Sequence, residues 1–206
     1  MIKVLIIDNY DSFTFNLKHQ VESILQKDRK NYNIFVLRND DPNLLTILKE
    51  KISAFFISPG PMTPKETGYL NEIFKKIVIK EDIPTFGVCL GFQFLSYFFG
   101  IDIYPSKYPK HGQQVDIYHN SEYIFSNLPS PFKAARYNSL QVSFKTNNYI
   151  NYLAYEIISK EEKIPMALKV KNKPFFGVQF HPESFLTENG DKIIKNFFKD
   201  YVYRSP

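Results

Sequence analysis

The first half of this 206-residue chain alternates short apolar runs with longer amphipathic segments, and this alternation most restricts its fold. Apolar runs of about four residues between turn signals predict buried strands, and the segments between them have helical periodicity. A helix between two strands lets both run in the same direction, so we expect a parallel sheet with helices on both faces. The predicted elements are strands at Val4–Ile7, Ile34–Leu37, Ala54–Ile57 and Thr85–Val88, and helices at Phe13–Gln26, Asn43–Lys51 and Tyr69–Ile79.

The pattern changes after Gly100, where strand-like runs follow one another without predicted helices between them. Strands joined by short connections pair antiparallel. We therefore expect an α/β fold with an open, mostly parallel twisted sheet flanked by helices, additional antiparallel strands in the second half, and a single domain over residues 1–206. The later elements are predicted strands at Val115–Tyr118, Phe132–Arg136, Tyr152–Ile158, Met166–Val170 and Phe175–Phe180, and a closing helix at Ile193–Val202.

Cys89 is the only cysteine, and it lies between an apolar strand and an apolar helix in the pattern Gly87-Val88-Cys89-Leu90-Gly91. Very small residues two positions away on each side permit a sharp strand-to-helix turn that presents a nucleophile. The amino end of the following helix stabilises negative charge on the sulfur, and the Leu90 N–H can face a developing oxyanion. A lone cysteine is more often a buried packing residue, but the flanking glycines favour catalysis here.

A cysteine nucleophile requires a base, and His181 is the strongest candidate among the four histidines. It follows the apolar run of the last predicted strand, and Glu183 is near enough in sequence to orient the imidazole and to stabilise its charged form. His19 lies on a polar helix face and His119 in a polar turn, so surface positions are expected for both. His111 lies beside a glycine in a predicted loop, and its role stays open.

The segment Ser58–Pro64 follows a predicted buried strand and contains three prolines and a glycine. Because the carboxyl ends of parallel strands meet at one edge of a sheet, we expect this segment to lie near Cys89. Few of its residues keep a free N–H, and those of Gly60 and Met62 can face a substrate. An ordinary proline-rich turn explains the segment equally well when it is considered alone.

The composition excludes several other classes of function. A single cysteine excludes an internal disulfide and a multi-cysteine metal site. The net charge of +5 arises from lysines interspersed with acidic residues, and no nucleic-acid motif is recognisable, so we expect no nucleic-acid binding. The chain has no signal-peptide pattern and no stretch of roughly 18 apolar residues, so we expect a cytoplasmic protein with no membrane role.

Taken together, these segments resemble the class I glutamine amidotransferase family, and in particular the glutaminase subunit, component II, of anthranilate or aminodeoxychorismate synthase. The resemblance covers essentially the whole chain and implies the flavodoxin-like fold of that family. The motifs that carry it are Asp8–Leu17, Ile57–Pro64, the cysteine segment Pro84–Gln93, Arg136–Leu140, and Phe176–Ser184 followed by the ending Thr187–Gly190.

The resemblance implies a Cys-His-Glu triad in which Cys89 attacks the side-chain amide of glutamine, while His181, oriented by Glu183, moves the proton. A glutamyl thioester forms and water releases glutamate, with the backbone N–H groups of Leu90 and Gly60 holding the oxyanion. The ammonia passes to a chorismate-using synthase subunit in a hetero-oligomer, and no metal or organic cofactor is needed. The residues implied to bind glutamine are Gly60, Pro61, Met62, Gln93, Ser139 and Leu140.

The chain departs from the family pattern at Met62, where the family often has glycine, at Phe92, where it commonly has histidine, and within Lys110–Gln114. A side chain at Met62 disfavours a backbone with positive φ in that loop. Two alternatives follow: a stand-alone γ-glutamyl hydrolase or peptidase, and a non-catalytic amidotransferase-like subunit. The motif Asp8–Leu17 disfavours the first, and retention of the complete triad disfavours the second. We expect little glutaminase activity without the partner.

Overall fold

The computed structural model describes residues 1–47, 50–145 and 147–203. Its strands form one sheet in the order β2-β1-β3-β4-β9-β8-β7-β5-β6. The strands from β2 to β9 in this order are parallel, whereas β8, β7, β5 and β6 pair antiparallel with their neighbours. The predicted fold class, a mostly parallel sheet extended by antiparallel strands, is therefore confirmed.

The first half matches the predicted alternation closely. Strands β3 and β4 have the predicted bounds, and the predicted helix at 69–79 is a short α-helix that continues as a π-helical turn. Residues 48 and 49 of the predicted helix at 43–51 lie outside the described residues. The elements are β1 (Ile2–Asp8), α1 (Thr14–Lys27), β2 (Tyr32–Arg38), α2 (Leu44–Ile47), β3 (Ala54–Ile57), α3 (Leu70–Ile73) with its π-turn (Phe74–Val78), β4 (Thr85–Val88) and α4 (Leu90–Phe98).

The second half differs from prediction mainly in one long strand. Strand β5 begins at Ile103 rather than Val115, so Lys110–Gln114, predicted as a loop, is part of the sheet. Its polar residues pair with β6 through two register shifts, which remove the regular alternation that would have revealed a strand. The elements are β5 (Ile103–His119), a 3-10 turn (Tyr123–Phe125), β6 (Phe132–Val142), β7 (Ile150–Ile157), β8 (Lys163–Val170), β9 (Phe175–Val178) and α5 (Gly190–Phe197) with its π-turn (Phe198–Val202).

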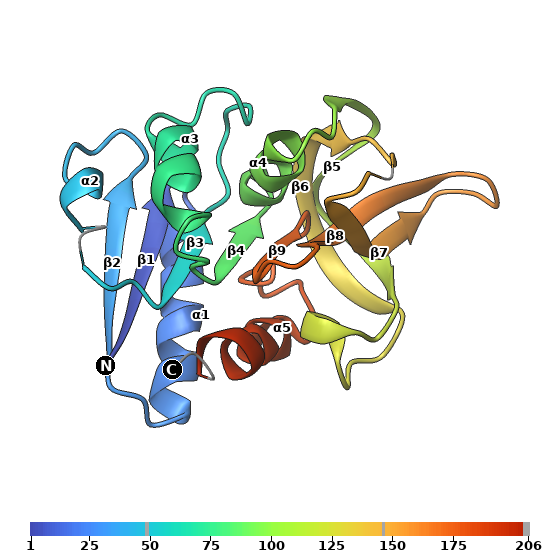
Figure 1. Ribbon diagram of the computed structural model, residues 1–206. Coiled ribbons are helices and arrows are strands. Elements are labelled where there is room, and N and C mark those ends of the chain that lie inside the picture. Colours follow the sequence, from blue (N-terminus) through green and yellow to red (C-terminus); the bar gives the residue numbers. More distant parts are fainter. Residues whose placement is uncertain (48–49, 146, 204–206) are drawn as a thin grey trace.

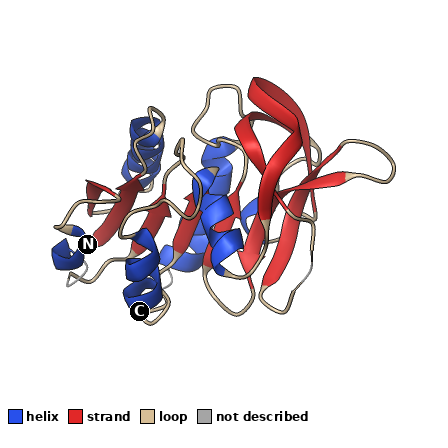
Figure 2. Ribbon diagram, turned by 90° about the horizontal axis from the view of Figure 1, so that it is seen from above, coloured by secondary structure: helices blue, strands red, loops and turns tan. Residues whose placement is uncertain are grey.

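Helices cover both faces of the parallel part of the sheet (Figures 1 and 2). On β1, Val4 and Ile6 pack in the core shared with α1 and α5, while Leu5 and Ile7 pack in the core shared with α2, α3 and α4. Alternate residues of a strand point to opposite faces, so a strand buried on both faces is apolar throughout. The antiparallel strands β5 to β8 lie together at the other end of the molecule (Figure 1).

Much of the core between the sheet and α5 is aromatic. Phe197 lies 5.7 Å from Phe56, 5.3 Å from Phe86 and 6.0 Å from Phe176, measured between ring centroids, and all four side chains are fully buried. The rings meet at steep angles, the arrangement that aromatic quadrupoles favour. Core packing thus accounts for part of the chain's high phenylalanine content. Among the described residues, no helix is long and apolar enough to cross a membrane.

We predict that Phe197→Ala lowers the free energy of unfolding by about 3–5 kcal/mol, because it leaves a cavity among rings that cannot collapse to fill it. The matched control is Phe185→Ala, whose side chain is 93% exposed and whose removal should change stability by less than about 0.5 kcal/mol. Equilibrium urea denaturation measures both. Equal destabilisation by the two substitutions would contradict the importance of the aromatic core.

Candidate active site

Cys89 occupies the sharp turn between β4 and α4. Its backbone has φ 52° and ψ −98°, a conformation that residues with a side chain rarely adopt. The turn is held on both sides, because the Cys89 N–H donates to the Val178 carbonyl at 2.8 Å and its carbonyl accepts from the Gln93 N–H at 3.0 Å. The strained strand-to-helix turn expected from the sequence is confirmed.

The two flanking glycines are required by close backbone approaches. A Cβ atom on Gly87 would lie 2.5 Å from the carbonyl of Gly91, and one on Gly91 would lie 2.5 Å from the carbonyl oxygen of Ile57. Neither backbone can retreat without moving β3, β4 or α4. The glycine pattern read from the sequence therefore has a steric cause, which is that strand and helix cross each other almost in contact.

His181 lies just after β9, the neighbour of β4 in the sheet, so residues about 90 positions apart in sequence meet at one sheet edge. Its Nδ1 lies 2.6 Å from Oε1 of Glu183, and both side chains are buried. The ring nitrogen Nε2 is also buried and has no hydrogen-bond partner among the residues that the structure describes. Glu183 thus fixes one side of the imidazole and leaves the other side for proton transfer.

Opposing effects set the protonation of His181. Burial disfavours the charged ring, but the Glu183 carboxylate and the nearby Cys89 sulfur outweigh it and raise the pKa of His181 well above its usual value. The rings of Phe13 and Tyr137 lie 5.2 Å and 4.9 Å from the imidazole, both edge-on. Packing on these rings restricts rotation of the imidazole, so its two nitrogens keep separate roles.

A cavity of about 230 Å³ lies over the cysteine turn. It brings together Cys89 and all six residues expected to bind glutamine, whereas His181, Glu183 and Leu90 are not part of its described lining. His111, Tyr137 and Asn138 line it as well, and sequence reasoning left the first open and did not select the other two. The lining consists of Gly60, Pro61, Met62, Cys89, Gln93, His111, Tyr137, Asn138, Ser139 and Leu140.

The loop after β3 lies against the cysteine turn. A Cβ atom on Gly60 would be 2.5 Å from Cδ2 of Leu90, so the two backbone segments expected to form the oxyanion site are neighbours. Met62, the departure from the family pattern, is not among the described non-glycine residues with positive φ. Its side chain therefore imposes no backbone strain on the loop in this conformation. Phe92, the second departure, lies on α4 and is fully buried in the core that α4 shares with α2 and α3.

The other histidines take different positions. His19 is exposed, as expected. The surface position predicted for His119 is wrong: its ring stacks on Phe125 at 4.8 Å and its Nε2 lies 2.7 Å from the carbonyl oxygen of Pro129. Burial lowers the pKa of His119, an effect that this hydrogen bond only partly offsets. His111 lies on β5 and its Nε2 is 3.2 Å from Oγ of Ser139, at the cavity.

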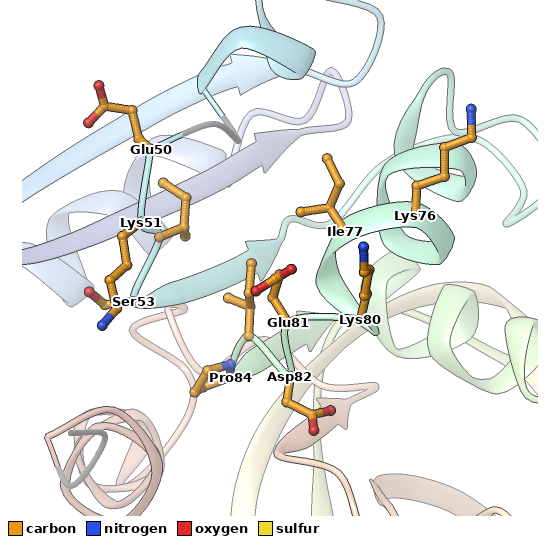
Figure 3. Close-up of a pocket in the computed structure, with 11 residues that line it drawn as sticks. Glu50, Lys51, Ser53, Lys76, Ile77, Lys80, Glu81, Asp82 and Pro84 are labelled. Carbon is orange, nitrogen blue, oxygen red and sulfur yellow. The ribbon is translucent and has the colours of Figure 1, made fainter.

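A larger hollow, of about 610 Å³, lies at the opposite edge of the sheet, at the amino ends of β3 and β4 (Figure 3). Its charged groups are mixed in sign, and several form ion pairs, such as Lys76 with Glu72 and Asp82 with Lys173. It holds none of the chemistry-bearing residues described above. Among the described residues, no group of three or more His, Cys, Asp or Glu side chains is arranged to hold a metal ion.

Comparison with known proteins places this geometry in context. Residues 5–201 match the model of the family described as glutamine amidotransferase class-I. The chain is 37% identical over 198 residues to "Aminodeoxychorismate/anthranilate synthase component 2" of Bacillus subtilis, covering 96% of each chain. It is 38% identical over 196 residues to "Bifunctional protein TrpGD" of Thermotoga maritima, covering 95% of this chain but only 32% of that protein. The chain thus spans about a third of the Thermotoga relative.

A solved structure shares the fold. It is described as a "putative gmp synthase subunit a protein" from Thermoplasma acidophilum, with a TM-score of 0.78 and 22% sequence identity. The match covers 97% of this chain and 93% of the other. At that identity, the likeness concerns the arrangement of helices and strands alone.

We predict that the rings of His119 and His181 titrate on opposite sides of the ordinary histidine value of about 6.5. His119 should lose its proton below that pH because burial destabilises its charged form, and His181 should keep its proton above it because Glu183 and Cys89 stabilise the imidazolium. Nuclear magnetic resonance titration of ¹⁵N-labelled histidine rings measures both, with His119→Asn and His181→Asn assigning the signals.

Glu183→Gln removes the negative charge beside His181 and should lower the pKa of that ring while leaving the titration of His119 unchanged. His119 serves as the internal control, because its hydrogen bonds involve other residues. A His181 signal that titrates at the same pH in both proteins would show that Glu183 does not hold the imidazolium.

Proposed function

The chain belongs to the glutamine amidotransferase class-I family, and we propose that it is the glutaminase subunit of a synthase that uses chorismate. In this role it hydrolyses glutamine to glutamate and ammonia, and the ammonia passes to the synthase subunit. One observation carries the proposal above all. The only cysteine, Cys89, lies in a strained turn and lines the same cavity as the residues expected to bind glutamine. The relative from Bacillus subtilis supports both the anthranilate and the aminodeoxychorismate reaction for the partner.

In the proposed mechanism, Cys89 gives its thiol proton to His181, and its Sγ atom attacks the side-chain amide carbon of glutamine and forms a tetrahedral intermediate. The protonated ring of His181 gives its proton to the amide nitrogen, so that ammonia leaves and a glutamyl thioester remains. Water then attacks the thioester, His181 accepts a proton from it, and glutamate is released with the thiol restored. The raised pKa of His181 supports this order, because an imidazolium is present before the leaving group needs a proton.

Backbone N–H groups of Leu90 and Gly60 are proposed to hold the oxyanion of each tetrahedral intermediate. Leu90 is the first residue of α4, where the helix dipole adds positive potential, and the side chain of Leu90 lies against Gly60. Glu183 is proposed to orient His181 through the hydrogen bond to Nδ1. No metal or organic cofactor takes part in these steps.

The proposed glutamine-binding residues come from three elements that line the cavity with the nucleophile. The loop after β3 contributes backbone groups, α4 contributes the Gln93 side chain, and β6 contributes the Ser139 and Leu140 backbone. A small cavity with several polar groups and one nucleophile suits a small amino acid better than a peptide. This distinction favours an amidotransferase over the alternative γ-glutamyl peptidase. The residues proposed to bind glutamine are Gly60, Pro61, Met62, Gln93, Ser139 and Leu140.

We propose a hetero-oligomer in which the synthase subunit covers the mouth of this cavity, because free ammonia would be protonated in bulk water. Exposed aromatic side chains on the segments that carry site residues support such a contact: Phe185, two residues after Glu183, is 93% exposed, and Tyr10 and Phe15 are exposed on either side of Phe13, whose ring contacts His181. Exposed large apolar groups at one place often mark a binding surface. The proposal includes a cytoplasmic location, where the free thiol of Cys89 stays reduced.

We predict that glutamate release from glutamine depends on Cys89 and rises when a chorismate-binding synthase subunit is added. Cys89→Ser should lower the rate by a factor of about 10³ or more, because a hydroxyl in the same turn lacks the nucleophilicity of the thiolate. The isolated wild-type chain should release glutamate slowly, since coupling to the acceptor synthase orders the site. A coupled glutamate dehydrogenase assay measures each rate.

The control for the Cys89→Ser protein is complex formation with the synthase subunit, measured by size-exclusion chromatography, which should equal that of the wild type. Equal release by wild type and variant would overturn the nucleophile assignment. Fast release without the synthase, together with cleavage of γ-glutamyl peptides, would favour the hydrolase alternative. Absence of release with a bound synthase would favour the non-catalytic alternative.

A further inference from the structure

Gln179 is a buried polar residue beside the nucleophile that the mechanism above does not use. It directly follows β9 and is only 1% exposed. Its backbone N–H donates to the Met166 carbonyl at 2.9 Å. The side chain reaches two groups of the site. Its Nε2 lies 3.5 Å from Sγ of Cys89, and its Oε1 accepts from Nε2 of Gln93 at 3.0 Å.

The direction of these hydrogen bonds follows from a carbonyl at one end. The Leu140 backbone oxygen can only accept, so the Gln93 atom 3.3 Å from it must be the amide nitrogen, Nε2. That nitrogen also contacts the Gln179 side chain, which must therefore present its oxygen to Gln93. The amide nitrogen of Gln179 then points toward the sulfur. Because the Leu140 oxygen can only accept, the orientation of both amides is fixed and the Gln179 N–H faces the Cys89 sulfur.

A buried cation anchors the same carbonyl from the other side. The guanidinium of Arg136 is fully buried and ion-paired with Glu156, and its Nε donates to Oδ1 of Asn138 at 3.0 Å. A guanidinium can only donate, so Asn138 turns its Nδ2 toward the Leu140 oxygen, at 2.8 Å. Burial lowers the pKa of Arg136, while attraction to Glu156 and Cys89 acts in the opposite direction. The guanidinium and the Leu140 oxygen therefore fix which atoms of Asn138 donate and accept, and the same oxygen fixes the orientation of Gln93.

We propose that Gln179 is a positioning residue that donates its Nε2–H to the Cys89 sulfur and ties the nucleophile to Gln93 in the substrate cavity. The inference rests on the proposed function of Cys89 as nucleophile. An N–H donor in a buried site stabilises the thiolate over the thiol and restricts the sulfur to one rotamer. Its oxygen holds Gln93, so the group that would recognise glutamine and the group that attacks it are aligned by one side chain.

Alkylation of Cys89 with iodoacetamide tests the inference without glutamine, and the single cysteine makes whole-protein mass spectrometry specific for this thiol. Gln179→Glu keeps an oxygen acceptor for Gln93 but places negative charge beside the sulfur. The midpoint of the rate-against-pH profile should rise by about one pH unit or more. Gln179→Met removes both hydrogen bonds at similar volume and should raise the midpoint by a smaller amount. If the buried carboxylate of the Gln179→Glu variant prevents folding, the Gln179→Met variant still tests the inference.

The matched control is Gln141→Glu, the same chemical change at another largely buried glutamine, whose side chain bonds to Ser106 and Tyr104 and not to the site. Its alkylation profile should equal that of the wild type. Circular dichroism and thermal melting verify the folded state of each variant. Midpoints within about 0.2 pH unit of the wild type in both Gln179 variants would overturn the inference.

Steady-state glutaminase kinetics of the complex with the synthase subunit give a second readout. Gln179→Glu should lower kcat with little change in the KM for glutamine, whereas Gln179→Met should also raise KM because Gln93 loses its support. An unchanged kcat in both variants would overturn the positioning role. Shifted alkylation profiles in a protein that hydrolyses no glutamine would support the hydrogen bond and overturn the proposed function, so the two failures are distinguishable.

Discussion

The close approach of three backbone segments at the cysteine turn is the constraint on which the site depends. Gly87 passes against Gly91, and Gly91 against Ile57, at distances that leave no room for a Cβ atom. This contact lets β4 run directly into α4 with Cys89 in a strained conformation at the sheet edge. The strain persists because hydrogen bonds from β9 and α4 hold the residue on both sides.

The position of β9 beside β4 supplies the rest of the proposed chemistry. Because the two strands are parallel neighbours, β9 ends at the same edge of the sheet as the cysteine turn. The segment that follows β9 therefore brings Gln179, His181 and Glu183 to that edge. Two groups are then held beside the Cys89 sulfur. One is the His181 imidazole, fixed by the buried Glu183 carboxylate, and the other is the Gln179 amide, fixed by hydrogen bonds that lead back to Arg136. Nδ1 of His181 and Oε1 of Glu183 compensate each other's desolvation, whereas Nε2 of His181 and Oε2 of Glu183 are buried with no hydrogen-bond partner among the described residues.

The sequence predicted the parallel half of the sheet well, because buried strands such as 54–57 and 85–88 are apolar runs with turn signals at both ends. It predicted β5 poorly. Residues 103–114 are mostly polar or proline, largely exposed, and pair through register shifts, so local periodicity carried no strand signal. The prediction for His119 was wrong because its polar neighbours suggested a surface turn, whereas its ring packs on Phe125 of the 3-10 turn that follows β5 and is buried there.

The sequence alone determined the chemical groups and the local geometry that a nucleophile needs, because the glycine spacing around Cys89 and the two-residue separation of His181 and Glu183 are local properties of the chain. The six residues that the family resemblance implied as glutamine contacts all line the cavity. Only the tertiary structure decided which polar groups far apart in sequence touch. The contact of Gln179 with Cys89 spans 90 positions, and no local pattern encodes it, because strand order and burial create it.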